Sequence, residues 1–263
     1  HLVVQDIFFT ETAWFADVIF PASAQPEKAG TYTNSNRQVQ IGFPVRKTPG
    51  EAKQDWKLIV DLAKKCGLNW DYKNVSAVYE EMASTMSSLN NISWQRLEKE
   101  GAVCYPVDDE TSFGNEILFS EGFPTSNGKA KIVPADLMPP DEKPNKKYPF
   151  ILTTGRLLEH WHTGAMTRRS SMLEAQEPIP TVSMHPYDIR NLGLKRGENV
   201  LVETQRGIIE ILLREDRDVS KGMLFIPFCF TESPANKLTN PHLDPYGKIP
   251  EFKYAAARVY KVN

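Results

Sequence analysis

The chain has few cysteines, and no two of them are close in sequence. Its 263 residues include only Cys66, Cys104 and Cys229. Because iron–sulfur clusters and structural zinc ions take cysteines at short spacings, the lack of a C-x-x-C pair excludes a self-contained site of either kind. An odd number without a close pair also argues against a disulfide framework. We expect all three to be buried as small hydrophobic side chains.

Long apolar runs, a strong net charge and a phosphate-binding glycine loop are also missing. Without a run of about 18 apolar residues, no segment is expected to span a bilayer. The 31 Lys and Arg nearly balance the 33 Asp and Glu, which gives no indication of nucleic acid or an anionic membrane as a partner. The absence of a G-x-x-x-x-G-K-[ST] sequence argues against nucleotide hydrolysis.

The beginning of the chain lacks the pattern of a secretory signal. The first residue is His1, and the apolar run Leu2-Val3-Val4 follows at once. No basic region followed by an apolar segment is present, so we expect a truncated or processed chain whose targeting signals lie upstream of His1. The lack of disulfide pairing favours a cytoplasmic over a periplasmic location.

The composition predicts two globular domains. A chain of this length, 41% hydrophobic and 24% charged, can bury two ordinary cores. Residues 134–147 contain four prolines among charged residues, which predicts a linker. We therefore expect one domain over residues 1–133 and a second over residues 148–263.

The first domain alternates short apolar runs with helical periodicity, which predicts part of an α/β layer with Rossmann-like connections. Its expected strands cover residues 2–6 and 16–21. A loop is expected over residues 27–32, and an Asn127-Gly128 turn between two extended segments predicts a hairpin. The expected helices cover residues 10–15, about 56–66, and two stretches between Val75 and Gly101, the second starting at Ser93 as its N-cap.

The second domain is predicted to be mainly β. Residues 200–204 and 208–212 flank Gln205-Arg206-Gly207, which is typical of a hairpin. Further strands are expected over residues 223–227 and 257–262, and a short helix over residues 185–192. A compact barrel is the predicted closure.

A loop rich in Gly, Thr, Arg and His follows the apolar run Phe150-Ile151-Leu152. It extends from Thr154 to Thr163 and leads into Met166-Thr167-Arg168-Arg169. Such a junction can present backbone and side-chain donors to an anion. From the residues alone, an ordinary junction with packed histidines fits equally well. His160 and His162 without a third ligand make a poor metal site.

One aspartate lies where an open α/β sheet binds ligands, at the carboxyl end of a strand, and a second begins an expected helix. Asp6 ends the first expected strand, and its carboxylate could accept two hydrogen bonds from the edge of a guanine base, or simply be solvated. Asp55 begins an expected helix. From the residues alone it acts as a helix cap, worth about 1 kcal/mol and requiring no ligand.

Four segments, in this order along the chain, resemble the molybdopterin oxidoreductases, in particular formate dehydrogenase alpha subunits and the related periplasmic nitrate reductases. They are Gln5-Asp6 with the run from Ala16 to Asn34, the run from Pro49 to Trp56, the Thr154–Thr163 loop, and Pro227-Phe228 with the following stretch to Lys253. Residues 67–72, 92–97 and 245–253 look like formate dehydrogenases and favour them over nitrate reductases.

The resemblance implies a double-psi β-barrel as the second domain and a very large cofactor. Family members bind two molybdopterin guanine dinucleotides (bis-MGD) around molybdenum or tungsten. Formate dehydrogenases oxidise formate to carbon dioxide and pass two electrons to iron–sulfur clusters. The metal ligand, its neighbouring His and Arg, and the cluster cysteines lie in the amino-terminal part of such chains. We therefore expect no catalytic residue and no metal ligand here, and no activity of this chain alone.

The resemblance also implies the cofactor-binding residues. Asp6 and Asp55 would bind the guanine edge, Thr154 and Arg156 the phosphates, and Gly155 would allow close backbone approach. The residues from His160 to Thr163 would line the pterin. The full expected set is Gln5, Asp6, Lys28, Asp55, Thr154, Gly155, Arg156, Leu157, Leu158, Glu159, His160, Trp161, His162, Thr163, Phe228, Asn236 and Lys253. Taken singly, Phe228, Asn236 and Lys253 fit a core aromatic, a turn and a solvated lysine as well.

The partners implied by the resemblance are the amino-terminal remainder of the alpha subunit, electron-transfer subunits, and formate as the substrate of the complete enzyme. A nitrate reductase and a non-catalytic cofactor-binding or assembly subunit stay open as alternatives, since fold alone does not decide function. We expect Asp6, Lys28, Asp55 and Arg156 to converge on one elongated cleft between the two domains.

Overall fold

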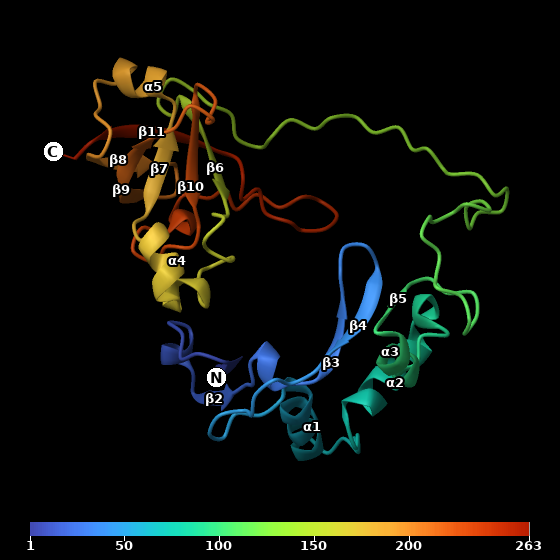
Figure 1. Ribbon diagram of the computed structural model, residues 1–263. Helices are drawn as coiled ribbons and strands as arrows, with labels where there is room; N and C mark the ends of the chain where they lie inside the picture. Colours follow the sequence, from blue (N-terminus) through green and yellow to red (C-terminus); the bar gives the residue numbers. More distant parts are fainter. Residues whose placement is uncertain (263) are drawn as a thin grey trace. The chain divides into compact units, whose positions relative to one another are not determined.

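The computed structural model describes residues 1–262, and the chain divides into two compact units, His1–Val133 and Pro134–Asn263. In Figure 1 the first unit is drawn from blue to green and the second from green to red. Each unit has a hydrophobic cluster of its own. The two units are therefore described one at a time.

The first unit begins with two parallel strands. Strand β1 (Val3–Asp6) pairs with β2 (Val18–Pro21), so that Asp6 lies opposite Pro21. An isolated bridge between Ala22 and Lys53 extends this edge by one further chain segment. Helix α1 (Asp55–Lys65) starts two residues later. The parallel arrangement therefore brings the ends of β1 and β2 and the start of α1 to the same edge, although α1 is distant in sequence.

A small antiparallel sheet and two helices form the core of the first unit. The sheet has the order β3 (Gly30–Thr33), β4 (Gln38–Gly42), β5 (Ala102–Cys104). Helices α2 (Val75–Thr85) and α3 (Trp94–Glu100) contribute to one apolar cluster with this sheet, and it includes Val39, Tyr79 and Leu97. The predicted cap is confirmed, because Ser93 Oγ accepts a hydrogen bond from Arg96 N at 3.1 Å.

The second unit is a closed barrel with the strand order β10-β6-β11-β8-β9-β7. Two of its strand pairs, β6 with β10 and β7 with β9, are parallel. The strands are β6 (Phe150–Gly155), β7 (Thr181–Met184), β8 (Asn199–Glu203), β9 (Ile208–Glu215), β10 (Met223–Pro227) and β11 (Ala255–Lys261). The barrel predicted from the strand pattern is confirmed.

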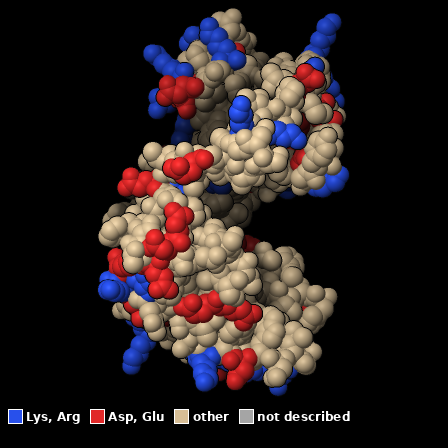
Figure 2. Space-filling model, turned by 90° about the vertical axis from the view of Figure 1, so that its right-hand side faces the viewer, with Lys and Arg blue, Asp and Glu red and all other residues tan. Residues whose placement is uncertain are grey.

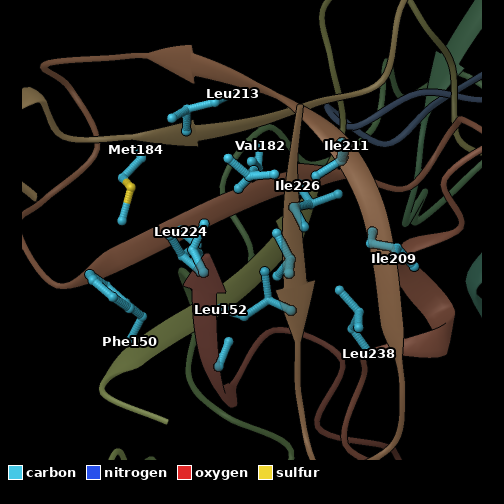
Figure 3. Packing of buried hydrophobic residues seen from close by; sticks show 14 of the residues in the cluster. Phe150, Leu152, Val182, Met184, Ile209, Ile211, Leu213, Leu224, Ile226 and Leu238 are labelled. Atoms are coloured by element: carbon cyan, nitrogen blue, oxygen red, sulfur yellow. The ribbon is translucent and has the colours of Figure 1, made fainter. Parts of the chain in front are cut away.

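Alternating side chains fill the barrel. Along β9 the buried positions are Ile209, Ile211 and Leu213, while the residues between them face outward. Figure 3 shows these side chains meeting others from β6, β7 and β10 in the interior. Two short helices, α4 (Ser171–Gln176) and α5 (Pro186–Asn191), lie in the connections before and after β7.

Several expectations for local structure are wrong. The expected loop over residues 27–32 contains strand β3, and residues 10–15 form a 3₁₀ turn, Ala13–Phe15, in place of a longer helix. The Asn127-Gly128 turn is present, since Gly128 N donates to Thr125 O at 3.1 Å, but its flanks form no strand pair among residues 1–262. Cys66 is exposed and Cys104 partly exposed, because both lie at element ends, whereas Cys229 is buried.

Lys, Arg, Asp and Glu side chains are all present on the face shown in Figure 2, with broad areas of other residues between them. This fits the small net charge of -2. A single-sign field that would attract a polyanion is not visible on this face.

We predict that the barrel core is sensitive to loss of volume at Leu224, whose side chain is 0% exposed. Leu224→Ala should lower the free energy of unfolding of the second unit by about 2–5 kcal/mol, because it removes buried methyl groups and leaves a cavity. The measurement is urea unfolding followed by hydrogen exchange of the β8 and β9 amides. Leu137→Ala is the control, since Leu137 is 100% exposed, and equal effects of the two substitutions would contradict the packing described.

Candidate functional site

The loop from Thr154 to Thr163 leaves the barrel at the end of a parallel strand pair. In the register of β6 and β10, Gly155 lies opposite Pro227. The residues that follow the two strands therefore start side by side, and Phe228 N donates to Gly155 O at 3.2 Å. This pairing places Arg156 and Phe228 next to each other, with the guanidinium 5.8 Å from the ring centroid.

Gly155 is required by packing. A Cβ atom at this position would lie 2.6 Å from the ring of Phe225 on the neighbouring strand. The sequence suggested close approach of a ligand to the backbone, and the structure shows close approach of an aromatic ring. A larger residue would push the two strand ends apart.

One face of the loop is open to solvent and carries Arg156, Trp161 and His162. Arg156 Nη2 lies 3.5 Å from both ring nitrogens of His162. The Trp161 ring meets the His162 ring edge-on at 4.7 Å and is 63% exposed. His162 adopts a positive φ of 50°, which turns the chain at this point. We call Arg156, Trp161 and His162 the outer face of the loop.

His160 points the other way, into the protein. Its ring is 0% exposed, and Nε2 lies 2.8 Å from Glu177 O. Nε2 donates this hydrogen bond, since a carbonyl oxygen can only accept. Nδ1 has no hydrogen-bond partner among residues 1–262. The ring also meets Phe230 edge-on at 5.7 Å. In this position His160 anchors the loop on the side that faces the protein interior. Its ring would have to move in order to contact a ligand.

The remaining expected residues of the second unit differ in exposure. Thr154 is buried, and its Oγ1 donates to Phe252 O at 2.9 Å, while Lys253 Nζ donates to Thr154 O at 3.3 Å. Leu158, Thr163 and Asn236 are exposed, and Asn236 lies in the 3₁₀ turn Ala235–Lys237. Leu157 and Glu159 are partly exposed. Lys253 thus joins the end of β6, which places it beside the start of the loop.

In the first unit, three expected residues form one connected group at the edge of the parallel strands. Gln5 Nε2 donates to Asp55 Oδ1 at 2.7 Å, and Lys28 Nζ donates to Asp55 Oδ2. Asp6, the neighbour of Gln5, uses its Oδ1 to accept from Ile7 N at 2.7 Å and from Phe8 N at 3.2 Å. The structure therefore brings Gln5, Lys28 and Asp55 together although they are far apart in sequence.

The structure shows the position of Asp55 in helix α1 and the contacts that keep its carboxylate ionised. Gln54 occupies the cap position of α1, and Asp55 is the first helical residue. Burial raises the pKa of Asp55, but the hydrogen bonds from Lys28 and Gln5 and the charge of Lys28 outweigh burial and hold that pKa below its ordinary value. Its two oxygens keep free lone pairs beside the bonds to Gln5 and Lys28, so further donors could still bind.

Among the described residues, 1–262, no group of three or more His, Cys, Asp and Glu side chains is arranged to hold a metal ion. In the same range, no helix is long and apolar enough to cross a membrane. The loop and the Asp55 group offer charges, hydrogen-bonding groups and aromatic rings to a ligand. The predicted convergence of the two groups on one cleft stays a prediction, because the units are described separately.

Sequence reasoning missed the residues that support the loop on its protein-facing side. They are Phe225, Arg168, Glu174, Glu177, Cys229, Phe230 and Glu232. Burial raises the pKa of the Cys229 thiol to about 11, so this cysteine is a packed side chain. Arg168 comes shortly after the Thr154–Thr163 loop in the sequence, but its partner Glu232 is 64 residues away. No local signal links such a pair.

Comparison with known protein families agrees with this fold. Residues 150–256 match the model of the Molydopterin dinucleotide binding domain, and residues 1–65 match that of Molybdopterin oxidoreductase. Acetylene hydratase from Pelobacter acetylenicus has the same fold over 99% of this chain and 40% of its own, with a TM-score of 0.77 and 23% sequence identity. The chain thus consists of a partial α/β layer, which matches the Molybdopterin oxidoreductase model, followed by a double-psi barrel, which matches the dinucleotide binding domain.

The chain is similar to formate dehydrogenase alpha subunits over 99% of its length. The F420-dependent formate dehydrogenase subunit alpha of Methanocaldococcus jannaschii is 41% identical, and that of enzyme 1 of Methanococcus maripaludis is 38% identical. The assimilatory nitrate reductase catalytic subunit of Bacillus subtilis is 33% identical. The chain spans 39% of the length of the two archaeal relatives and 38% of the nitrate reductase.

We predict that the bond from Lys28 controls the titration of Asp55. Because the folded pKa of Asp55 lies below its ordinary value of 3.8, the ionised carboxylate stabilises the fold above that value, and this contribution is lost as the pH falls through the lower, folded pKa. In Lys28→Met the pKa of Asp55 should rise, as measured by NMR titration of the Asp55 carboxyl carbon. Lys57→Met, at an exposed position on the same helix, should leave it unchanged. An equal rise in both variants would contradict a specific pair.

Proposed function

We propose that this chain is the cofactor-binding, carboxy-terminal part of the alpha subunit of a molybdenum- or tungsten-dependent formate dehydrogenase. The observation that carries the proposal is the 41% identity over 99% of the chain to an F420-dependent formate dehydrogenase alpha subunit. The complete enzyme would oxidise formate to carbon dioxide and pass two electrons to iron–sulfur clusters. The metal ligand and the clusters would lie outside this chain.

The chemistry of the donor set supports a molybdopterin guanine dinucleotide, in the form of bis-MGD, as the ligand. Such a molecule carries phosphates and flat heterocycles, and the barrel offers an exposed guanidinium, Arg156, beside the open rings of Trp161 and His162. Arg side chains suit phosphate because their planar N–H groups match its oxygens. When bound, the metal of this cofactor would supply the two-electron chemistry, and the protein would bind and orient it.

The Asp55 group is suited to binding a guanine base. Guanine presents two neighbouring N–H donors, and an ionised carboxylate accepts such a pair. Lys28 and Gln5 keep Asp55 ionised and fixed. Asp6 lies at the same strand edge, one residue after Gln5. We propose that Asp6 and Asp55 bind the base, while Arg156 and Lys253 neutralise the phosphates.

A large apolar surface of the first unit supports the proposed partners. Parallel strands are normally covered on both faces, yet Val3 of β1 and Val18 of β2 are 46% and 38% exposed. Nearby, Phe20, Leu58 and Leu62 line an open hollow of about 520 Å³. We propose that the amino-terminal remainder of an alpha subunit covers this surface and that electron-transfer subunits bind the assembled enzyme. A cytoplasmic location stays a prediction.

The proposal is tested on the complete polypeptide that contains this chain. After denaturation, the released cofactor should contain a pterin and guanine in equal amounts, identified by mass spectrometry. The native enzyme should reduce a dye with formate as donor. Turnover with nitrate and none with formate would instead favour the nitrate reductase alternative, which the 33% identity to the Bacillus subtilis protein supports. Bound guanine without either activity would favour a cofactor-binding or assembly subunit.

We predict that Arg156→Ala weakens cofactor retention in the complete enzyme. Loss of charge-assisted hydrogen bonds to phosphate should reduce affinity by about ten- to a hundredfold, measured as guanine released per polypeptide after dialysis. Arg196→Ala is the matched control, because Arg196 is an exposed arginine of the same unit. Full retention in Arg156→Ala would remove Arg156 from the proposed site.

A further inference from the structure

Arg168 binds two carboxylates at once on the protein-facing side of the loop. Its Nε and Nη2 donate to Glu174 at 3.3 and 3.0 Å, and its Nη1 and Nη2 donate to Glu232 at 2.8 and 2.7 Å. The guanidinium also lies 4.8 Å from the centroid of the buried ring of Phe230. These bonds use four N–H···O contacts of one side chain that is only 18% exposed.

These contacts join two neighbouring elements of the chain to a segment 64 residues away. Glu174 lies in α4, whereas Glu232 follows β10, and Arg168 itself lies in the 3₁₀ turn Thr167–Arg169. Arg168 N donates to Gly164 O at 2.9 Å, so the arginine also holds the end of the loop. The loop is thus fixed to the chain segment that follows the neighbouring strand.

The stem of Arg168 explains the glycine at position 164. Gly164 has a φ of 75°, and a Cβ there would lie 2.6 Å from Arg168 Cγ and 3.2 Å from Cys229 O. The arginine therefore packs directly on the backbone of the loop. The hydrogen bonds and charges of Glu232 and Glu174 raise the pKa of Arg168 above its usual range, so it stays charged in this position.

We propose that Arg168 is the positioning residue that holds the outer face of the loop (Arg156, Trp161 and His162) ready for the cofactor. This inference rests on the proposed function for its consequence, cofactor retention. The loop is fixed at three points: Gly155 by Phe225, His160 by Glu177 O, and Gly164 by Arg168. Of these three, Arg168 is the one whose ion pair, with Glu232, joins the end of the loop to the segment after β10.

Charge alone is not sufficient for this role. The planar fork of an arginine matches two carboxylates, whereas a lysine offers a point charge that satisfies one of them well. We therefore expect Arg168→Lys to rescue the loop only in part. Glu232→Gln and Glu174→Gln each leave one carboxylate in place, and they serve as milder variants if Arg168→Met does not fold.

The test is hydrogen exchange of the loop amides in the complete polypeptide, with the β8 and β9 amides as a measure of the barrel. In Arg168→Met the amides of Trp161 and Gly164, which donate to Thr167 Oγ1 and Trp161 O, should exchange about tenfold faster or more, while the barrel amides stay protected. Arg168→Lys should fall between Arg168→Met and the wild type. Cofactor content per polypeptide should fall in the same order.

The matched control is Arg258→Met, which removes another arginine–glutamate pair of the barrel, Arg258 Nη2 to Glu203 at 2.6 Å, away from the loop. It should leave exchange at Trp161 and Gly164 unchanged. Unchanged loop exchange in Arg168→Met, or the same change in Arg258→Met, would overturn the inference. If the loop loosens as expected but no guanine-containing pterin is found in the wild type, the proposed function fails and the positioning role of Arg168 stands.

Discussion

The parallel pairing of β6 with β10 is the constraint on which the candidate site depends. Parallel strands cannot be joined by a tight turn, so a long crossover separates them, and it here includes β7, α5, β8 and β9. In return, both strands end at one edge of the barrel, and the segments after them start together. The contacts of Arg156 with Phe228 and of Arg168 with Glu232 all follow from this edge. Closure of the barrel around an apolar interior keeps the two strands in register.

The first unit uses the same geometry with fewer elements. The carboxyl end of β1 delivers Gln5, and the segment that pairs beside β2 leads into α1 and delivers Asp55. Lys28 reaches the same carboxylate from the segment after β2. The result is an acid whose charge is maintained by a lysine and whose orientation is maintained by an amide. An acid in this state accepts hydrogen bonds without first losing a proton.

The fold class could be predicted from the sequence, because its signals are contained in short stretches. These are the apolar alternation along residues 200–212 and the resemblance of separate segments. The strand at Gly30–Thr33 was missed, since its pattern of small and polar residues is that of a loop and only pairing with β4 makes it a strand. Candidate site residues could be named, but their orientation could not. His160 and His162 look alike in sequence, yet one is buried by Glu177 and Phe230 and the other is exposed. Glu232, one of the two partners of Arg168, is 64 residues away on the segment after β10, and no periodicity in the sequence indicates this pair.

The contact between Gly155 and Phe225 has a consequence for the evolution of this barrel. Because a methyl group at position 155 would lie only 2.6 Å from a ring carbon of Phe225, the two positions are expected to vary as a pair. A homologue with alanine or serine at 155 should carry a smaller side chain at 225, and a homologue that keeps the phenylalanine should keep the glycine. Drift at either position is therefore restricted by its neighbour across the strands, independently of any selection for ligand binding.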